Sequence, residues 1–359
     1  MAIRSVSLRT FRNHRDTVLD KSGHINLLLG RNGAGKTNIL EALSLLAPGR
    51  GLRRAAPADL PLAGAGDFAV GVGVATAAGE VRLGTHTLPG QGGRRFARIN
   101  GAPATLTTLA EWLSLAWLTP AMDGLFTGPA SGRRLYLDRL TVACDPRHAA
   151  HATRYAAALR ERNRLLAAGG GADDPRWLDA VERLLAEHGA ALSRGRKGLV
   201  DALAGRMEAE RDALFMPPAL HYRAGGPTEA GALLDALQAG RRSDAAAGRT
   251  LLGPHRDELE VRHASRDMAA AQCSTGEQKA MLIAMTLAHA QLAAGSRPAV
   301  LLLDEVAAHL DPERRAALFA RLRSGAAQVW LTGTDAAPFS ALGQDAAVWL
   351  VEEGKARPA

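Results

Sequence analysis

The chain has 359 residues, of which 47% are hydrophobic, and it carries a formal net charge of +8. This length allows one large or two ordinary domains, and the positive balance suits a polyanionic partner such as nucleic acid. Two cysteines without metal-ligand spacing exclude a disulfide framework. No apolar run approaches the length of about 18 residues that a membrane helix needs, and the first residues lack the apolar core of a signal peptide. We therefore expect a cytoplasmic protein that does not enter a membrane.

The first residues follow patterns typical of strands. Residues 2–8 alternate apolar and polar side chains, as a half-buried strand does, and residues 11–14 are predicted as a turn or an edge. Residues 25–29 are continuously apolar, which predicts a buried strand. Residues 38–46 then carry apolar side chains at helical spacing. A strand and a helix are therefore expected on either side of residues 30–37.

Residues 30–37 read GRNGAGKT, which fits the phosphate-loop pattern G-x-x-x-x-G-K-[ST]. Glycines let successive backbone N–H groups turn toward polyphosphate, and the following helix adds the positive end of its dipole. In this pattern Lys36 reaches the β- and γ-phosphates, and Thr37 ligates Mg²⁺. The alternative is a glycine-rich turn without a ligand. We predict an ATP site that comprises Gly30, Arg31, Asn32, Gly33, Ala34, Gly35, Lys36 and Thr37.

Three antiparallel strands with glycine-rich turns are predicted over residues 68–74, 80–84 and 94–99. Asn100-Gly101 is a turn signal after the last of them. We therefore expect a mixed sheet rather than a purely parallel one. Two arginine clusters accompany these strands. The first, Arg50, Arg53 and Arg54, could contact nucleotide or DNA or lie in a solvated turn. The second, Arg94, Arg95 and Arg98, could present positive charge on one edge of the sheet.

The pattern becomes helical from about residue 131 to 237, with clear amphipathic segments at residues 155–166 and 177–192. No heptad run is long enough for a long coiled coil. The basic run of Arg194, Arg196 and Lys197 consists either of phosphate contacts or of a solvated helix face. We predict an α/β fold with a mixed sheet, in which a mainly helical lobe interrupts a nucleotide-binding domain. The lobe comprises residues 126–249, and the two halves of the domain comprise residues 1–125 and 250–359.

An acidic element near residue 304 completes the predicted nucleotide site. Residues 299–303 are an apolar run followed directly by Asp304 and Glu305. A buried strand that ends in two carboxylates fits the partner of a phosphate loop, because ligands of open α/β sheets lie at the carboxyl edge. We expect Asp304 to hold Mg²⁺ and Glu305 to orient and deprotonate the attacking water, with Lys36 as the other catalytic residue. The alternative is an acidic strand-to-loop cap.

The segment Cys273-Ser274-Thr275-Gly276-Glu277-Gln278 opens a predicted helix over residues 279–294. Ser274 and Glu277 form a capping box. The order of phosphate loop, Ser-x-Gly and acidic strand also resembles the ATP-binding-cassette superfamily. That resemblance implies an ATPase head in which Ser274 and Gly276 cap the γ-phosphate bound by a second subunit. Two chains would then sandwich two ATP molecules.

Further positions follow from the same resemblance. Asp311, within His309-Leu310-Asp311-Pro312, lies where the superfamily has its dimer-contacting loop, and it joins the predicted nucleotide site. Thr332 and Thr334 stand in the expected switch loop, where many such ATPases carry a histidine. Asp123 occupies roughly the place of the glutamine loop.

A narrower resemblance covers nearly the whole chain. Four segments carry it: residues 8–13 (LRTFRN), 35–42 (GKTNILEA), 158–166 (ALRERNRLL) and 252–257 (LGPHRD). They are similar to the bacterial RecF family of DNA recombination and repair ATPases, which belongs to the SMC-like part of the cassette superfamily. A chromosome-structure ATPase head of the kind with long heptad arms is excluded, because this chain has no room for such arms.

This resemblance implies an ATP-dependent protein that binds DNA gaps and single-strand/duplex junctions during repair, replication restart and the SOS response. It also implies ATP-dependent homodimerisation, weak DNA-stimulated hydrolysis that times release, and work with RecR, RecO and the RecA recombinase. One alternative is an ATPase subunit of a membrane transporter, against which the inserted lobe argues. Another is a passive DNA-binding scaffold with a degenerate ATP site, against which the intact Lys36, Thr37, Asp304 and Glu305 argue.

Overall fold

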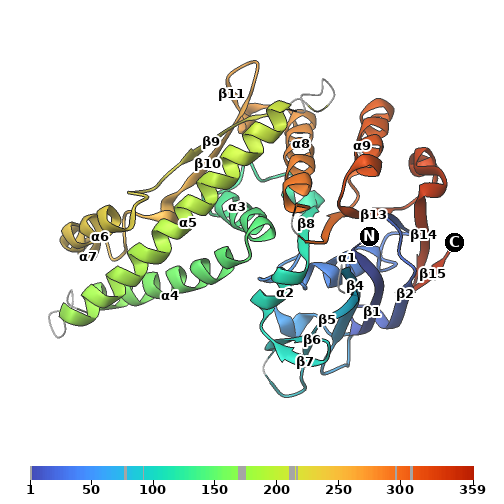
Figure 1. Ribbon diagram of the computed structural model, residues 1–359, viewed down its shortest axis with the longest axis horizontal. Coiled ribbons are helices and arrows are strands. Elements are labelled where there is room, and N and C mark those ends of the chain that lie inside the picture. The colour runs from blue at the N-terminus through green and yellow to red at the C-terminus, as the bar shows by residue number, and fades with distance from the viewer. Residues whose placement is uncertain are drawn as a thin grey trace. The chain divides into compact units, whose positions relative to one another are not determined.

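The chain forms two compact units, whose elements are labelled in Figure 1. The computed structural model describes residues 2–76, 79–91, 93–168, 175–209, 215, 217–295, 297–307 and 310–359. The first unit comprises Met1–Asp123 and Lys279–Ala359, and the second comprises Gly124–Glu210 and Pro217–Gln278. The second unit extends to Gln278 because β10 (Glu258–His263) pairs with β9 (Ala219–Arg223). The sequence places the return to the nucleotide-binding domain at residue 250.

An antiparallel sheet of the first unit has the strand order β2-β1-β4-β5-β6-β7. The three strands predicted between residues 68 and 99 are present as β4, β5 and β6. The sequence did not predict β2, which pairs with β1 from Phe11↔His14 to Ser5↔Asp20. The bounds are β1 (Ile3–Phe11), β2 (His14–Asp20), β4 (Ala69–Thr76), β5 (Gly79–Thr87), β6 (Arg95–Ile99) and β7 (Ala102–Ala104).

The other sheet of the first unit is mixed, as expected, with the order β15-β14-β3-β13-β12-β8. Its neighbouring strands are parallel except for the pair β14 and β15. Strands β3, β8, β12 and β13 are buried along their length, which explains their continuous apolar runs. The bounds are β3 (Ile25–Leu29), β8 (Ser114–Leu118), β12 (Ala299–Leu303), β13 (Gln328–Gly333), β14 (Ala346–Glu352) and β15 (Lys355–Pro358).

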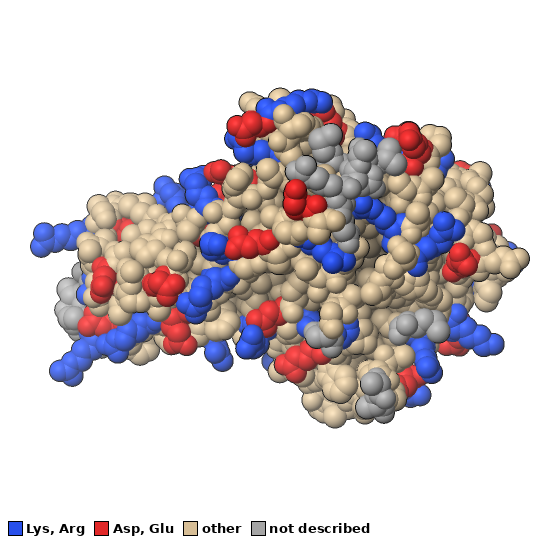
Figure 2. All heavy atoms as spheres, turned by 45° about the horizontal axis from the view of Figure 1, so that its top comes forward, with Lys and Arg blue, Asp and Glu red and all other residues tan. Residues whose placement is uncertain are grey.

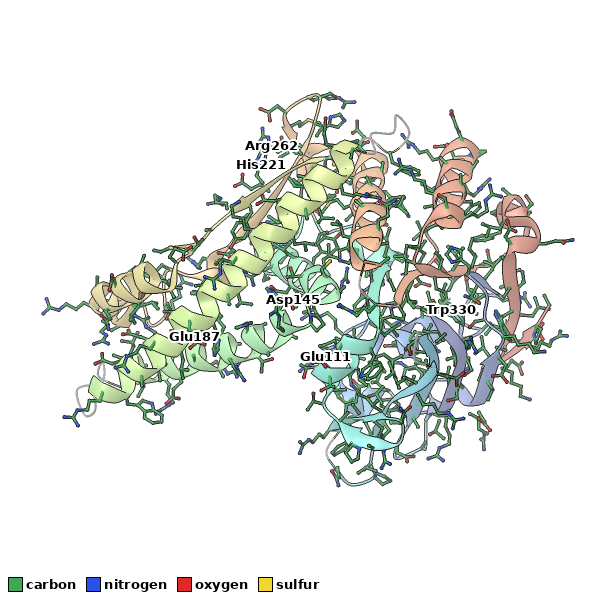
Figure 3. The ribbon with its side chains drawn as sticks, viewed as in Figure 1. Glu111, Asp145, Glu187, His221, Arg262 and Trp330 are labelled. Atoms are coloured by element: carbon green, nitrogen blue, oxygen red, sulfur yellow. The ribbon has the colours of Figure 1, made fainter. Side chains whose placement is uncertain are left out.

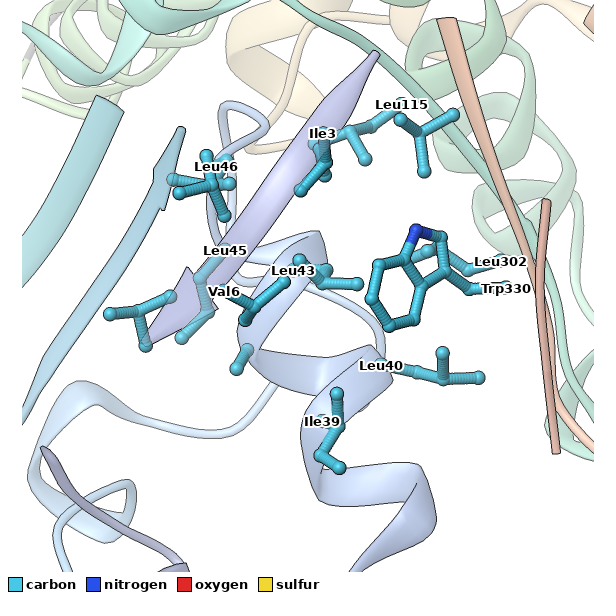
Figure 4. Close-up of a cluster of buried hydrophobic side chains, with 14 of the residues drawn as sticks. Ile3, Val6, Ile39, Leu40, Leu43, Leu45, Leu46, Leu115, Leu302 and Trp330 are labelled. Carbon is cyan, nitrogen blue, oxygen red and sulfur yellow. The ribbon is translucent and has the colours of Figure 1, made fainter. Parts of the chain in front are cut away.

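Helix α1 (Lys36–Ser44) contacts both sheets, since it touches β1 of one and β8 and β13 of the other. Its residues Leu40 and Leu43 are fully buried. Figure 4 shows them beside Trp330 of β13, with Val6 of β1 near the same helix. Full burial of such a side chain contributes about 1.5–3 kcal/mol. The core therefore holds in place the helix that follows the phosphate loop.

The first unit also contains the helices α2 and α9 and most of α8. They are α2 (Leu106–Trp112), α9 (Pro312–Ser324) and α8 (Thr275–Ala293), of which α8 begins in the second unit. Short 3-10 helices of both units are η1 (Pro57–Asp59), η2 (Pro120–Met122), η3 (Pro254–Arg256), η4 (Ala270–Gln272) and η6 (Ala337–Asp345). Among the described residues, no helix combines the length and the apolar character that crossing a membrane requires.

The second unit is mainly helical, as predicted. Helix α4 packs against α5, which also contacts α6, around a core that includes Tyr155, Leu185 and Leu233. A three-stranded sheet, β11-β10-β9, accompanies these helices. His221 of β9 and Arg262 of β10 mark this sheet in Figure 3. The other elements are α3 (Ala130–Cys144), α4 (Arg147–Ala167), α5 (Pro175–Ala209), α6 (Ala230–Ala239), α7 (Arg241–Ala246) and β11 (Met268–Ala269).

Candidate nucleotide-binding site

The phosphate loop connects β3 to α1, so strand, loop and helix follow one another as predicted. Gly33 and Gly35 have φ angles of 82° and 117°, in the region that favours glycine. A Cβ atom on Gly30 would lie 2.2 Å from the Val351 carbonyl oxygen. A Cβ atom on Gly35 would lie 2.7 Å from His14 Nε2. The glycines of the pattern are therefore needed for the turns of the backbone and also for its close packing.

Lys36 folds back across the loop. Its Nζ atom donates to the carbonyl oxygens of Gly30 at 2.6 Å and Arg31 at 3.0 Å. Burial lowers the pKa of the Lys36 ammonium, while the nearby carboxylates of Glu305 and Asp304 act in the opposite direction. The predicted lysine and both predicted carboxylates therefore lie close together. The loop residues between its two ends are more open, and those at the tip are exposed: Arg31, Asn32 and Gly33, followed by the half-buried Ala34.

The Asp304 carboxylate joins the loop to the end of β13. Asp304 Oδ1 accepts hydrogen bonds from Thr37 Oγ1 at 2.8 Å and from Thr332 Oγ1 at 2.9 Å. The Glu305 N–H donates to Thr332 Oγ1 at 2.8 Å. Glu305 has a φ of 52°, which is uncommon for a residue with a side chain. Hydroxyl and carboxylate oxygens are the ligands that Mg²⁺ prefers, so Thr37 and Asp304 fit that ion.

Two segments that the sequence did not assign to the site lie against the carbonyl side of the loop. His14 is fully buried, and its Nε2 lies 3.1 Å from the Gly35 carbonyl oxygen. The Gly354 N–H, in the turn between β14 and β15, donates to the Ala34 carbonyl oxygen at 2.9 Å. Burial lowers the pKa of His14, against the effect of hydrogen bonds to backbone carbonyls. The polar pair Asn13-His14 directly after the alternating first strand was the sequence signal for this contact.

A buried carboxylate in α1 binds two arginines. Glu41 is fully buried and pairs with Arg12 at 2.7 Å and with Arg53 at 3.2 Å. The hydrogen bond to Glu41 raises the pKa of Arg12. Arg53 also donates to Asn38 Oδ1 at 2.7 Å. Arg53 therefore connects the segment after α1 to the helix itself. The sequence had suggested two other roles for it, a ligand contact or a solvated turn.

Two arginines that the sequence offered as surface charge are used inside the fold. Arg95 Nη2 donates to the Gly49 carbonyl oxygen at 2.9 Å, and burial lowers the pKa of Arg95 to about 10. Arg196 pairs with Asp138 and with Asp257, each at 2.8 Å. The expectation of exposed positive charge was therefore wrong for these two. On the face drawn in Figure 2, Lys and Arg side chains are interspersed with Asp and Glu.

The start of α8 has the predicted capping box. The Ser274 N–H donates to Glu277 Oε2 at 2.9 Å, and the Glu277 N–H donates to Ser274 Oγ at 3.3 Å. The Ser274 N–H and the Ser274 hydroxyl, at 2.8 Å, both donate to the Glu277 carboxylate and lower its pKa, and this carboxylate also pairs with Arg266 at 2.8 Å. Gly276 lies in the first turn of the helix. Ser274 and Gly276 belong to the second unit, whereas the phosphate loop belongs to the first.

Two further candidates of the sequence, Asp311 and Asp123, have contacts within the first unit. Asp311 is the N-cap of α9, where its carboxylate accepts from the Arg314 N–H at 2.9 Å. Asp123 Oδ2 lies 3.9 Å from Lys279 Nζ. His309 lies outside the described residues. In the described part of the chain, Asp311 therefore caps a helix, and Asp123 lies within ion-pair distance of Lys279.

The chain is similar to proteins of one family over nearly its whole length. The family model described as RecF/RecN/SMC N terminal domain matches residues 2–355. A protein of Mesorhizobium japonicum named DNA replication and repair protein RecF is 46% identical over 373 residues, which cover 99% of this chain and 97% of that protein. A protein of the same name from Rhizobium meliloti is 45% identical, with 98% and 97% covered.

Solved structures share the fold. The recombination mediator protein RecF-ATPrS of the RecFOR pathway superposes with a TM-score of 0.84 at 22% identity, over 99% of this chain and 97% of that chain. The structure of RecF-ATP gives a TM-score of 0.83, also at 22% identity, over 100% and 97%. An SMC head bound to the C-winged helix domain of ScpA gives 0.58 at 15% identity, over 100% and 97%. The mixed α/β architecture is therefore that of RecF and SMC ATPase heads.

Proposed function

The chain belongs to the RecF family of SMC-like ATPases, which serve DNA replication and repair, and from this premise we propose that it is an ATP-dependent DNA clamp. In this proposal the protein dimerises with ATP on gapped or junction DNA in the cytoplasm. Slow, DNA-stimulated hydrolysis acts as a timer that releases the DNA. While bound, the protein helps to load RecA, with RecR and RecO as partners in the same pathway.

The observation that carries the proposal is the contact between the phosphate loop and the acidic strand end. Thr37 Oγ1 and Asp304 Oδ1 are 2.8 Å apart, although 267 positions separate the two residues in the sequence. They would hold Mg²⁺, which would neutralise phosphate charge there. Lys36 and the N–H groups of Gly30–Thr37 would bind the β- and γ-phosphates. A nucleotide triphosphate with its metal therefore suits this end of the first unit.

Glu305 is the proposed base for the attacking water. A base must lie within one hydrogen bond of the proton that it takes. The Glu305 N–H is held by Thr332 Oγ1, which also donates to Asp304, so the backbone of the base is tied to the proposed metal ligand. The left-handed conformation of Glu305 is a costly one, and such costs are often found at functional positions.

The proposed site needs a second copy of the chain. Ser274 and Gly276, at the N-terminal end of α8, would cap the γ-phosphate bound by the other protomer, where helix N–H groups favour an anion. Asp311 would lie at the contact between the protomers. We also propose residues 1–125 and 250–359 as the ATPase domain and residues 126–249 as the lobe. ATP promotes the dimer only if it binds the dimer better than the monomer.

DNA binding in this proposal depends mainly on phosphate contacts. The net charge of +8 suits a polyanion, and phosphate contacts give affinity without much sequence reading. Binding should therefore weaken steeply with salt, because each phosphate that the protein neutralises releases counterions. An affinity for gapped duplex that stays constant between low and moderate salt would contradict phosphate-led binding.

Analytical ultracentrifugation on a gapped duplex tests the proposal. Wild type, Lys36→Ala and Glu305→Gln are compared without nucleotide, with ADP and with ATP. We expect ATP-dependent dimers on DNA for wild type, longer-lived dimers for Glu305→Gln, and none for Lys36→Ala. If Lys36→Ala dimerises on DNA like wild type, the scheme is wrong. If ATP binds but DNA does not bind under any nucleotide, an ATPase coupled to another partner replaces the DNA clamp.

A further inference from the structure

The carbonyl oxygens of the phosphate loop are held from behind by two hairpin turns. The Ala34 carbonyl accepts hydrogen bonds from Asn13 Nδ2 at 3.0 Å and from the Gly354 N–H at 2.9 Å. The Gly35 carbonyl oxygen lies 3.1 Å from His14 Nε2. Because a carbonyl oxygen only accepts, Nε2 is the protonated ring nitrogen of His14 in this contact. Asn13 and His14 lie at the β1–β2 turn, and Gly354 lies at the β14–β15 turn.

These contacts fix the direction of the loop's N–H groups. Among the described residues every peptide bond is trans, and in a trans peptide the C=O and the N–H point in opposite directions. Holding the carbonyl oxygen of Ala34 therefore directs the Gly35 N–H away from the two turns. The Gly35 carbonyl oxygen also accepts the first hydrogen bonds of α1, from the Asn38 and Ile39 N–H groups at 3.0 and 3.2 Å, and together with His14 these bonds direct the Lys36 N–H in the same way. These two N–H groups then face the side of the loop on which phosphate is expected.

The donors behind the loop are themselves fixed. Asn13 Oδ1 accepts from Asn38 Nδ2 of α1 at 2.7 Å. His14 Nδ1 lies 3.0 Å from Thr17 Oγ1, whose hydroxyl donates to the Gly354 carbonyl oxygen at 2.9 Å. His14 and Thr17 are both buried. The two turns therefore form one hydrogen-bonded network with the loop between them.

Close packing keeps the two turns in register. Gly354 has a φ of 74°, and a Cβ atom placed on it would lie 2.0 Å from the Asn13 carbonyl oxygen. A Cβ atom on Gly35 would collide with both Asn13 and His14, at 2.8 and 2.7 Å. No larger residue fits at either glycine without moving a turn. The C-terminal hairpin, more than 300 positions from the loop, is thus part of its support.

We propose that Asn13, His14 and Gly354 form a positioning clamp that presets the phosphate loop for ATP. The clamp acts through the backbone of Ala34 and Gly35 and does not touch the nucleotide. It lowers the reorganisation that the loop would otherwise undergo on binding, which raises affinity by preorganisation. This inference rests on the proposed binding of ATP phosphates by the loop.

The test compares His14→Leu, which fills the space without a donor, with His14→Gln, which keeps a side-chain N–H donor. Binding of Mg·ATP is measured by isothermal titration calorimetry. We expect His14→Leu to bind about tenfold more weakly than wild type, which corresponds to about 1.4 kcal/mol. His14→Gln should stay within about threefold of wild type, because the donor remains. Melting temperatures establish that each variant is folded.

His24→Leu is the matched control. His24 Nε2 contacts the Leu322 carbonyl oxygen at 3.2 Å in the same unit, away from the loop. This variant also loses an imidazole contact to a carbonyl, and it should bind Mg·ATP like wild type. Equal affinity of His14→Leu and wild type would overturn the clamp, as would equal weakening in His14→Leu and His14→Gln.

Asn13→Asp keeps the test decisive if His14→Leu does not fold. The aspartate retains an acceptor for Asn38 but removes the donor to Ala34, so affinity for Mg·ATP should fall. Wild-type affinity in Asn13→Asp would refute the clamp. If wild type itself binds no Mg·ATP, the proposed function fails. If wild type binds and the donor variants bind equally well, only the clamp fails.

Discussion

The phosphate loop of the first unit and the buried ion-pair cluster of the second unit differ in whether their buried cation has a carboxylate partner. Arg162 is fully buried and pairs with Glu182 at 3.0 Å and with Asp244 at 2.6 Å. Lys36 is also buried, yet Nζ donates only to neutral carbonyl oxygens, and among the described residues it forms no ion pair within 4.0 Å. A buried charge is costly unless it is paired. The lysine is therefore suited to an anionic ligand, whereas the arginine is a structural residue.

The sequence motifs of the second unit also take part in structural contacts. Residues 158–166 and 252–257 support the narrower family resemblance, and both lie in the second unit. Around them, Thr250 donates through its N–H to Asn163 Oδ1 at 2.9 Å, and the Tyr155 hydroxyl lies 2.8 Å from His255 Nδ1. These two segments therefore take part in contacts that hold the second unit together.

Replacing Arg162 with Met should have the largest effect on stability. It leaves the buried Asp244 carboxylate without its guanidinium, and it leaves Glu182 with Arg241 as its remaining cationic partner. Removing one partner of a buried ion pair costs about 3–5 kcal/mol. The control is Arg164→Met, since Arg164 is 64% exposed and pairs with Glu161 on the same helix. Because solvent screens such an exposed pair, Arg164→Met should unfold at nearly the same urea concentration as wild type.

Urea unfolding followed by circular dichroism measures both free energies. A loss of less than about 1 kcal/mol in Arg162→Met would show that the cluster relaxes or admits water, and it would remove the contrast with the phosphate loop.

Replacing Lys36 with Met should instead have a small effect on stability and a large effect on the affinity for Mg·ATP. The free energy of unfolding should change by less than about 1 kcal/mol, because a partly desolvated cation without a carboxylate partner is lost. Affinity for Mg·ATP should fall about 10- to 100-fold, from the about 1.5–3 kcal/mol of a charge-assisted hydrogen bond. Calorimetric titration and urea unfolding of one preparation give both numbers. A large loss of stability would mean that Lys36 is structural, like Arg162.

Asp138 provides a pH test of the second unit. Burial raises the pKa of this carboxyl, but hydrogen bonds from His148 and Arg196 outweigh it and hold the pKa at about 2, below the ordinary 3.8. Because the folded pKa lies below the unfolded one, the stabilisation is complete above about pH 4 and is lost as the pH falls toward 2. It amounts to about 2 kcal/mol.

Urea unfolding of wild type and Asp138→Asn between pH 6 and 3 measures this contribution. The difference between the two proteins should shrink as the solution becomes more acidic. A difference that stays constant over this range would mean that Asp138 does not keep its charge through these contacts.

The smallest expected effect is at the start of α8. Ser274→Ala removes the hydroxyl that accepts from the Glu277 N–H, and loss of such a cap costs about 1 kcal/mol. Ser274→Thr keeps the hydroxyl and serves as the control. If Ser274→Ala unfolds at the same urea concentration as wild type, the serine contributes nothing as a cap, and a role toward ligand would be its remaining use.

Local patterns of the sequence determined the elements of this protein that depend on neighbouring residues. The glycines and lysine of residues 30–37, the carboxylates after the apolar run at residues 299–303 and the Ser274–Glu277 capping box were all predicted, and the structure places them as expected. Each depends on contacts within a few positions or on the rule that strands of one sheet share an edge. Periodicity also predicted β4, β5 and β6 and the helical character of the second unit.

Only the tertiary structure decided which polar residues face inward and which segments meet. The sequence did not predict the short strands β2 and β9, and it offered Arg95 and Arg196 as surface charge. It could not predict that the β14–β15 turn supports the phosphate loop. An exposed arginine and a buried, paired one have the same local pattern. Their difference depends on partners far away in the chain, which packing selects and local sequence does not specify.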